Sequence, residues 1–140
     1  MINSAKEFID LLNSGIEMDR ERAATDKASD SVWEDVILNH PDYEIFILQN
    51  ETISPLTIKT LSKSLNWKTR HGVAKKRKSG TEILTYLSND EDPIVRQAIA
   101  ANQKTPYAIL KKLCLDTDDR VSRVANYNIK LRSPQQAPGN

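Results

Sequence analysis

The chain has 140 residues, and its charges nearly balance, with 20 Lys and Arg against 19 Asp and Glu and a formal net charge of +1. This length suits one domain, and a hydrophobic content of 39% is enough for a modest core. The overall charge indicates neither a nucleic-acid-binding protein nor an acid-tolerant secreted protein.

The charges are distributed unevenly along the chain. Residues 1–51 contain 4 basic and 12 acidic side chains, residues 52–89 contain 8 and 1, and residues 90–140 contain 8 and 6. The net charge therefore runs from −8 through +7 to +2.

The N-terminal residues predict a soluble protein without a signal peptide. Met1–Leu12 has no basic region followed by an apolar core, and no apolar run approaches the length needed to span a membrane. The single cysteine, Cys114, permits no intramolecular disulfide and fits a reducing compartment. We therefore expect a cytoplasmic protein in which Cys114 is a buried small apolar residue and not a reactive thiol.

The N-terminal segment predicts two helices. Ser4 and Glu7 form a capping box, and an apolar face follows before the chain turns at Asn13-Ser14-Gly15. A second, polar helix is expected from about Met18 to Ala28. Because neither helix matches the repeat described below, residues 4–30 are predicted to be a helical cap on residues 31–132. A further capping box, Ser31-Val32-Trp33-Glu34, predicts the helix that opens the first repeat, with a stop at Asn39-His40-Pro41.

A 26-residue repeat appears when the chain is aligned with itself. Residues 67–92 and 93–118 share eight identities, and weaker copies precede and follow them. The identical pairs are Arg70/Arg96, Ala74/Ala100, Lys78/Lys104, Ile83/Ile109, Leu84/Leu110, Leu87/Leu113, Asp90/Asp116 and Asp92/Asp118. Four units are visible, of which the first and the last are degraded.

Each unit predicts a pair of short helices. Asp92 supplies an N-cap, and Pro93 suits the first helical position, where no N–H donor is needed. Asn102 predicts a helix stop, either in a left-handed conformation or through side-chain hydrogen bonds, and Thr105-Pro106 predicts a second cap-and-proline start. Two such short helices cannot bury their apolar stripes alone, so neighbouring units must stack.

The pattern D-P-x-V-R-x-A-I-A-x-N-x-x-T-P-x-x-I-L-x-x-L over residues 92–113 resembles the leucine-rich repeat variant family, a branch of the HEAT-like α-solenoids. The resemblance covers roughly residues 36–130. It implies an all-α fold, a short right-handed α-solenoid of about four two-helix repeats with this 26-residue period. We expect one domain over residues 1–132 and a disordered tail over residues 133–140. Some members hold an iron–sulfur centre on a cysteine cluster, but this chain has only Cys114, so no cofactor is expected.

Motifs of catalysis are missing from the sequence. It contains no glycine-rich phosphate loop, nucleophile elbow, paired-histidine zinc motif or cysteine pair. The two histidines, His40 and His71, are far apart in the sequence, and a metal or general-base role is not indicated for either. We expect no enzymatic activity and no metal site.

One cluster of basic residues departs from the repeat pattern. Lys75-Lys76-Arg77-Lys78 stands where the next unit has Ala101-Asn102-Gln103-Lys104. It is either a solvated turn or a binding patch for phosphate or an acidic protein surface. The candidate patch comprises Lys68, Arg70, His71, Lys75, Lys76, Arg77 and Lys78. For Arg70 and Arg96, a ladder of salt bridges to the repeated aspartates is favoured over ligand contact.

The acidic N-terminal part predicts a second candidate surface, which would dock a basic partner. Its residues are Asp19, Glu21, Asp26, Asp30, Glu34, Asp35, Asp42 and Glu44. Trp33, Trp67, Tyr43, Phe46 and Tyr86 are expected to pack in the core or between layers.

These observations favour a non-catalytic protein–protein interaction module. One concrete version, by analogy with small bacterial repeat proteins, is an immunity or inhibitor protein that occludes its partner. The alternative is a nucleic-acid-binding HEAT-like protein that uses the basic turn from Lys75 to Lys78. Neither hypothesis identifies the partner.

Overall fold

The computed structural model describes residues 1–132, which contain ten α-helices, two 3-10 turns and no strand. The predicted all-α class is confirmed. The predicted disordered tail, residues 133–140, lies outside the described residues. No helix in the described range has the length and apolar character required to cross a bilayer. The chain forms two compact units, Met1–Ser64 and a second that starts at Leu65, which we call unit 1 and unit 2.

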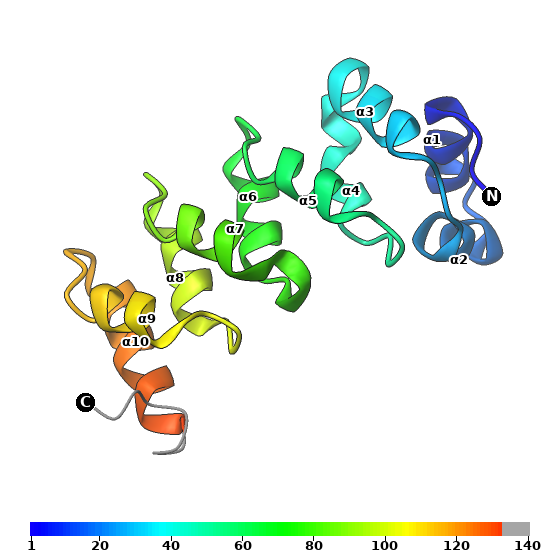
Figure 1. Cartoon of the computed structure of the whole chain (residues 1–140). Helices are drawn as coiled ribbons and strands as arrows, with labels where there is room; N and C mark the ends of the chain where they lie inside the picture. The colour runs from blue at the N-terminus through cyan, green and yellow to red at the C-terminus, as the bar shows by residue number, and fades with distance from the viewer. Residues whose placement is uncertain (133–140) are drawn as a thin grey trace. The chain divides into compact units, whose positions relative to one another are not determined.

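Unit 1 is built around α3, which packs against α1 on one side and α5 on the other (Figure 1). Its elements are α1 (Ala5–Asn13), α2 (Glu17–Thr25), α3 (Asp30–Asn39), the 3-10 turn Pro41–Tyr43, α4 (Glu44–Ile47) and α5 (Pro55–Leu61). Phe8 of α1 and Trp33 of α3 are both buried, and their rings meet edge to face with centroids 5.0 Å apart. Residues before α1 are also fixed to this unit, since the Ile2 N–H donates a hydrogen bond to the Lys27 carbonyl at 2.8 Å.

The helix starts of unit 1 follow the predicted chemistry in part. The Ser4 hydroxyl accepts from the Glu7 N–H at 3.0 Å, as the capping box predicts. The second helix ends at Thr25, short of the expected Ala28. The capping box at Ser31 is wrong, because Ser29 is the N-cap of α3 and Ser31 lies inside the helix, with its hydroxyl 2.8 Å from that of Ser29.

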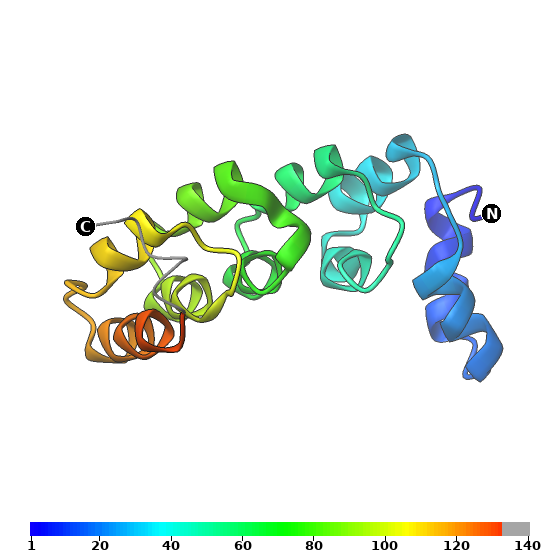
Figure 2. The ribbon, with the colours of Figure 1, turned by 60° about the horizontal axis from the view of Figure 1, so that its bottom comes forward.

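Unit 2 has two rows of helices (Figure 2). Its helices are α6 (Trp67–Ala74), α7 (Gly80–Leu87), α8 (Pro93–Ala101), α9 (Tyr107–Leu113) and α10 (Asp119–Leu131), with a 3-10 turn at Arg77–Ser79 before α7. The first row consists of α6, α8 and α10, with α8 packed against both neighbours, and the second row consists of α7 and α9. Buried aliphatic side chains fill the space between them, including Leu84, Leu87, Ile99, Leu110 and Leu113.

The same hydrogen bonds recur with the period of the repeat in unit 2. The Asn102 amide donates to the carbonyls of Ala74 at 2.9 Å and Lys76 at 3.1 Å. The Asn128 amide donates in the same way to Ala100 at 2.8 Å and more weakly to Asn102 at 3.4 Å. These bonds satisfy carbonyls at the end of one helix from the next helix in the row, and so join neighbouring helices.

The repeated arginines form the predicted ladder of ion pairs. Arg70 donates to both carboxylate oxygens of Asp90, at 2.8 and 3.2 Å. Arg96 does the same with Asp116, at 2.8 and 3.1 Å. Both pairs are largely buried, with 11% and 6% of the side chains of Arg70 and Asp90 exposed. The prediction that these arginines are structural is confirmed.

Two details of the repeat differ from expectation. The N-cap of α9 is Pro106 and not Thr105, whose buried hydroxyl instead donates to the Ile99 carbonyl at 2.7 Å. Asn102 ends α8 in an extended conformation, with φ −71° and ψ 123°, so its side-chain bonds and not a left-handed backbone stop the helix. The start of α8 is as predicted, since Asp92 accepts from the Ile94 N–H at 2.8 Å.

Candidate binding groove

Two adjoining hollows lie on the row formed by α6, α8 and α10. The first, of about 500 Å³, is lined by His71, Lys75, Ile94, Gln97, Ala98, Ala101, Asn102 and Val124. The second, of about 460 Å³, is lined by Arg77, Ala101, Gln103, Lys104, Val124, Tyr127, Asn128, Leu131 and Arg132. They share Ala101 and Val124, so together they form one surface, which we call the groove.

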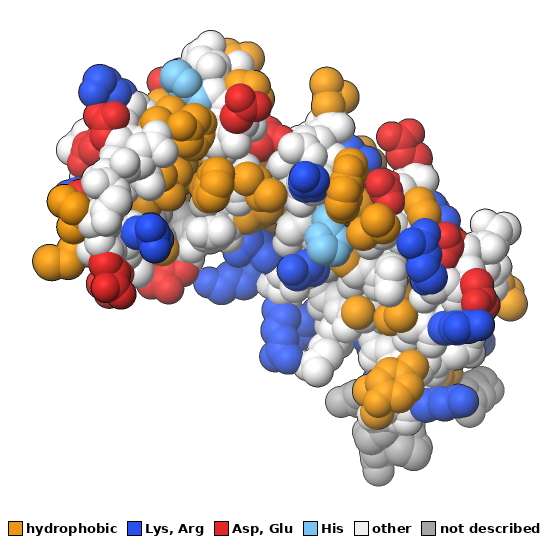
Figure 3. Space-filling view, turned by 180° about the vertical axis from the view of Figure 1, so that it is seen from behind, with side chains coloured by type: hydrophobic (Ala, Val, Ile, Leu, Met, Phe, Trp, Pro, Cys, Tyr) orange, Lys and Arg blue, Asp and Glu red, His pale blue; other side chains and the backbone are white. Residues whose placement is uncertain are grey.

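The groove combines positive charge with apolar surface. Lys75, Arg77, Lys104 and Arg132 line it, and none of its described lining residues is acidic. The lining also includes small or aliphatic side chains, namely Ile94, Ala98, Ala101, Val124 and Leu131. Figure 3 shows blue cationic and orange apolar side chains intermingled around the pale-blue histidine of this unit. Such a lining attracts anions and also offers apolar contact.

The second hollow holds two guanidinium groups around one neutral residue. Arg77 donates from Nη2 to the side-chain oxygen of Gln103, and Arg132 donates from Nη2 to the backbone carbonyl of Gln103 at 3.2 Å. Burial lowers the pKa of the Arg132 guanidinium from its usual value. Both arginines are thus held in place by neutral acceptors.

The first hollow contains the only histidine of unit 2. The His71 ring lies 6.2 Å from the Trp67 ring, edge to face. Burial lowers the pKa of His71, the positive charge of Lys75 lowers it further, and Asp92 acts in the opposite direction. At neutral pH the imidazole is therefore mainly uncharged, and an anion bound nearby would favour its protonation.

The predicted basic patch is divided by the fold. His71, Lys75 and Arg77 line the groove, whereas Arg70 is buried in its ion pair with Asp90. Lys76 is half-buried, and its pKa is lowered first by burial and then by Lys78.

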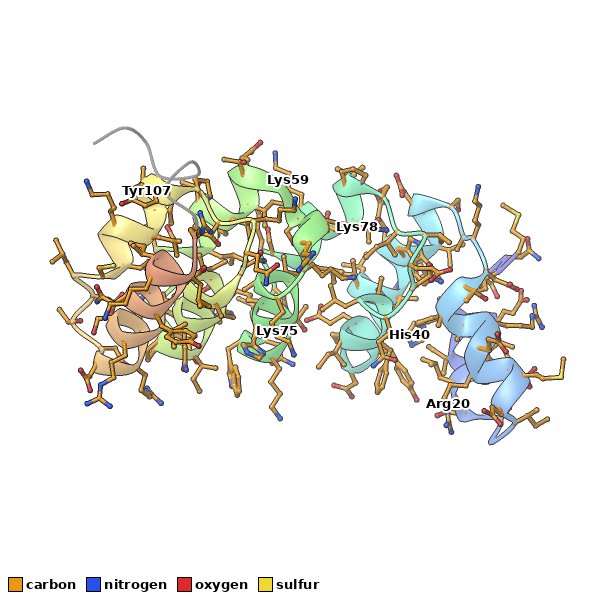
Figure 4. All side chains as sticks on the ribbon, turned by 90° about the horizontal axis from the view of Figure 1, so that it is seen from below. Arg20, His40, Lys59, Lys75, Lys78 and Tyr107 are labelled. Carbon is orange, nitrogen blue, oxygen red and sulfur yellow. The ribbon has the colours of Figure 1, made fainter. Side chains whose placement is uncertain are left out.

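The remaining members of the patch lie elsewhere. Lys68 is exposed beside Trp67, with its Nζ 6.0 Å from the ring centroid. Figure 4 shows Lys75 at the row of α6 and Lys78 nearer the start of α7. The four consecutive cations therefore do not form a single surface.

Several groove residues were missed by the sequence reasoning, namely Gln103, Lys104, Val124, Tyr127, Leu131 and Arg132. The 26-residue repeat could have identified some of them. When the repeats are aligned, Lys75, Ala101 and Tyr127 fall at one equivalent position, and Ala98 and Val124 fall at another. Because Val124 and Tyr127 lie on α10, the side chains at these equivalent positions would have indicated that α10 contributes to the candidate site.

The predicted acidic face in unit 1 is partly used by the fold itself. Asp26 pairs with Arg22 at 3.0 Å, and Asp30 accepts from the Ser54 hydroxyl at 2.8 Å. Asp35 accepts from the Asn39 amide, and Glu44 is buried and accepts from the Ser64 hydroxyl. Asp19 is half-buried, whereas Glu21, Glu34 and Asp42 are exposed.

The aromatic residues that were predicted to pack in the core differ in their burial. Trp33 is buried as predicted, but the prediction is wrong for Trp67, Phe46 and Tyr86, which are 38%, 39% and 53% exposed. Tyr43 is half-buried, and its hydroxyl accepts from the Asn13 amide at 3.0 Å. Large aromatic residues are often only partly buried, so sequence hydrophobicity alone overestimated the burial of Trp67, Phe46 and Tyr86.

Metal ligands do not cluster within residues 1–132, where no group of three or more His, Cys, Asp and Glu side chains is suitably placed. Cys114 is half-buried at the end of α9, and burial raises the pKa of its thiol. A raised thiol pKa disfavours the nucleophilic thiolate at neutral pH.

Comparison with known proteins returned no match to any family model, curated protein or solved structure.

Proposed function

We propose that this chain is a non-catalytic protein-binding module whose groove receives an acidic, partly apolar segment of another protein. The observation that carries the proposal is the lining of the groove, in which lysines and arginines surround apolar side chains and no carboxylate is present among the described lining residues. Positive charge steers an acidic partner toward the groove, and the apolar lining residues contribute contact area.

The apolar part of the lining favours a protein over a nucleic acid. Tyr127 and Leu131 are 64% and 66% exposed, and Val124 is half-buried between them and the first hollow. A phosphodiester backbone placed on Val124 and Leu131 would lose hydration without gaining hydrogen bonds from them. An acidic peptide with apolar side chains matches both halves of the lining.

The recurrence of hydrogen bonds supports a repeat protein as the scaffold for this groove. The ion pairs of Arg70 and Arg96 and the amide bonds of Asn102 and Asn128 each recur with the period of the sequence repeat. We propose that the helical repeats of unit 2 form a short α-solenoid of the HEAT-like kind. In such an arrangement, a row of equivalent helices presents one extended binding surface.

A pair of labelled peptides tests the proposal by fluorescence anisotropy. One is built from Glu-Glu-Leu-Leu repeats, and the other replaces each Glu by Gln. We expect the acidic peptide to bind more tightly, with an affinity that falls as salt is added. The double variant K75S/K104S, which removes two exposed groove cations, is expected to weaken binding about tenfold, or roughly 1.4 kcal/mol.

The matched control is K63S/K111S, which removes the same charge at two exposed lysines that do not line the groove. Its affinity should stay within about twofold of the wild type, since distant surface charges are largely screened. Equal binding of the two peptides overturns the proposal. So does tighter binding of a short duplex DNA than of the acidic peptide, which would establish the nucleic-acid alternative.

A further inference from the structure

We infer that Arg77 and Arg132 form a carboxylate subsite at one end of the groove, which receives a Glu or Asp side chain of the partner. The inference rests on the proposed function and adds to it the chemical group that is recognised. It follows from how these two arginines differ from the other arginines of unit 2.

Four arginines of unit 2 are already paired with carboxylates. Arg70 pairs with Asp90, Arg96 with Asp116, Arg120 with Asp118 at 3.0 Å and Arg123 with Asp119 at 2.8 Å. Within the described chain, Arg77 and Arg132 instead donate to the neutral side chain and backbone of Gln103. Their hydrogen-bonding groups are oriented, but their charges are not balanced by a carboxylate in the hollow that they line.

None of the described residues that line this hollow carries a negative charge. Lys104 adds a third cation to the same hollow. An anion that enters the hollow therefore meets three positive groups and, among the described lining residues, no negative one.

The geometry of guanidinium groups favours a planar carboxylate. A guanidinium group presents parallel N–H donors that match the two oxygens of a carboxylate, and two oriented arginines lose little further side-chain entropy on binding. Arg132 is half-buried, so its interaction with an anion is less screened by water than that of an exposed arginine. Gln103 holds both arginines before the ligand arrives.

The surroundings of the subsite indicate what should accompany the carboxylate. Tyr127 and Leu131 line the same hollow and are largely exposed. If the partner has an apolar side chain close to its bound carboxylate, that side chain would cover Tyr127 and Leu131. The partner segment is therefore expected to place a Glu or Asp next to an aliphatic or aromatic residue.

Arginine-to-lysine variants test the subsite separately from the general charge of the groove. R77K and R132K retain the positive charge but remove the paired N–H donors. If the subsite exists, the double variant R77K/R132K should bind the Glu-Glu-Leu-Leu peptide at least about tenfold more weakly than the wild type, with binding of the Gln peptide unchanged. R123K is the matched control, because Arg123 is exposed, pairs with Asp119 and does not line the groove.

A second variant guards against loss of folding. Gln103→Glu places a carboxylate between the two arginines, so it should keep or raise the thermal stability while weakening peptide binding by a similar factor. NMR of arginine side-chain Nε–Hε groups gives a readout that does not depend on affinity. The signals of Arg77 and Arg132 should shift on adding the acidic peptide, and those of Arg120 and Arg123 should not.

The outcomes separate the two proposals. Wild-type affinity in R77K/R132K, together with weakened binding in K75S/K104S, overturns the carboxylate subsite and leaves the acid-binding groove in place. Uniform shifts of all surface arginines also overturn the subsite. Failure of the wild-type protein to distinguish the acidic peptide from the Gln peptide overturns both.

Discussion

Asparagines at equivalent positions connect neighbouring helices in both units. The Asn102 amide donates to two carbonyls of unit 2, and the Asn50 amide donates to the carbonyls of Ala23 and Asp26 in unit 1, each at 2.9 Å. The side-chain oxygen also accepts locally, from the Lys104 N–H and the Thr52 N–H respectively. One buried residue thus satisfies three backbone groups. Lys76 occupies the equivalent position of its repeat, and it has no side-chain amide that could bond to these backbone groups.

Replacing Asn102 by Ala should destabilise the protein by about 1–3 kcal/mol, because one buried carbonyl, one partly buried carbonyl and one N–H lose their hydrogen bond to this side chain. Urea denaturation followed by circular dichroism measures the change. Asn126→Ala is the control, since Asn126 is exposed and donates only to Ser122 in its own helix. An effect of N102A as small as that of the control would show that these bonds contribute little.

His71 should make the stability depend on pH. Its folded-state pKa lies below the ordinary value of 6.5, because of burial and then Lys75, with Asp92 opposing. The unfolded chain therefore binds the proton more readily, and the contribution of His71 to stability, complete above pH 6.5, is lost as the pH falls through the folded-state pKa. The free energy of unfolding of H71Q should fall less than that of the wild type between pH 7.5 and 5.5.

The same residue predicts the opposite trend for binding. A carboxylate in the groove favours the protonated imidazole, so affinity for the acidic peptide should rise as the pH falls over this range. H71Q should remove this rise. H40Q is the matched control, because His40 is exposed at the end of α3 in unit 1 and does not line the groove. A wild-type affinity that is constant with pH would contradict the placement of His71 beside the ligand.

At the scale of helices, the ladder of ion pairs links each first-row helix to the loop before the next. Asp90 and Asp116 each accept two bonds from an arginine and one from a backbone N–H two residues later. The carboxylate thereby holds the loop that leads into the N-cap Asp92 or Asp118. Capping, charge pairing and helix stacking are coupled through one side chain.

Asp90→Asn should therefore cost about 3–5 kcal/mol, since it leaves the buried Arg70 charge without its carboxylate. Asp119→Asn removes a similar pair at the surface, where the side chains of Arg123 and Asp119 are 79% and 71% exposed, and should cost less than about 1 kcal/mol. Both values come from denaturation curves at the same pH and salt. Similar losses in the two variants would mean that burial does not determine the contribution of the pair.

At the scale of the molecule, the two units carry opposite net charges. Unit 1 contains 6 basic and 12 acidic residues, and unit 2 contains 14 and 7. The near-neutral total of the chain conceals this division. Because four of the eight predicted acidic docking residues in unit 1 already contact other groups of that unit, the positive groove of unit 2 carries the binding proposal.

Deleting residues 1–28 should unfold or loosen unit 1, because it removes Phe8 and Leu11 from the core around Trp33. In a W67F background, Trp33 is the only tryptophan, and its emission should shift to longer wavelength as water reaches it. The full-length W67F protein is the control. A sharp thermal transition with unshifted emission would show that these residues are dispensable for the core.

The sequence by itself determined the features that depend on short-range chemistry or on the 26-residue register. The caps at Ser4 and Asp92 were predictable, because a side-chain acceptor bonds to an N–H only two or three residues away. The ion pairs of Arg70 and Arg96 were predictable because both partners recur together. The all-α class follows from the same apolar spacing.

Only the tertiary structure decided which side chains meet and which face water. Arg77 and Arg132 are distant in the chain, yet both donate to Gln103, because α6, α8 and α10 lie side by side in one row. Glu44 and Trp67 look like a surface carboxylate and a core aromatic, but the first is buried and the second is partly exposed. Burial depends on which neighbouring helices cover a residue, and that arrangement is a property of the packed layers and not of local sequence.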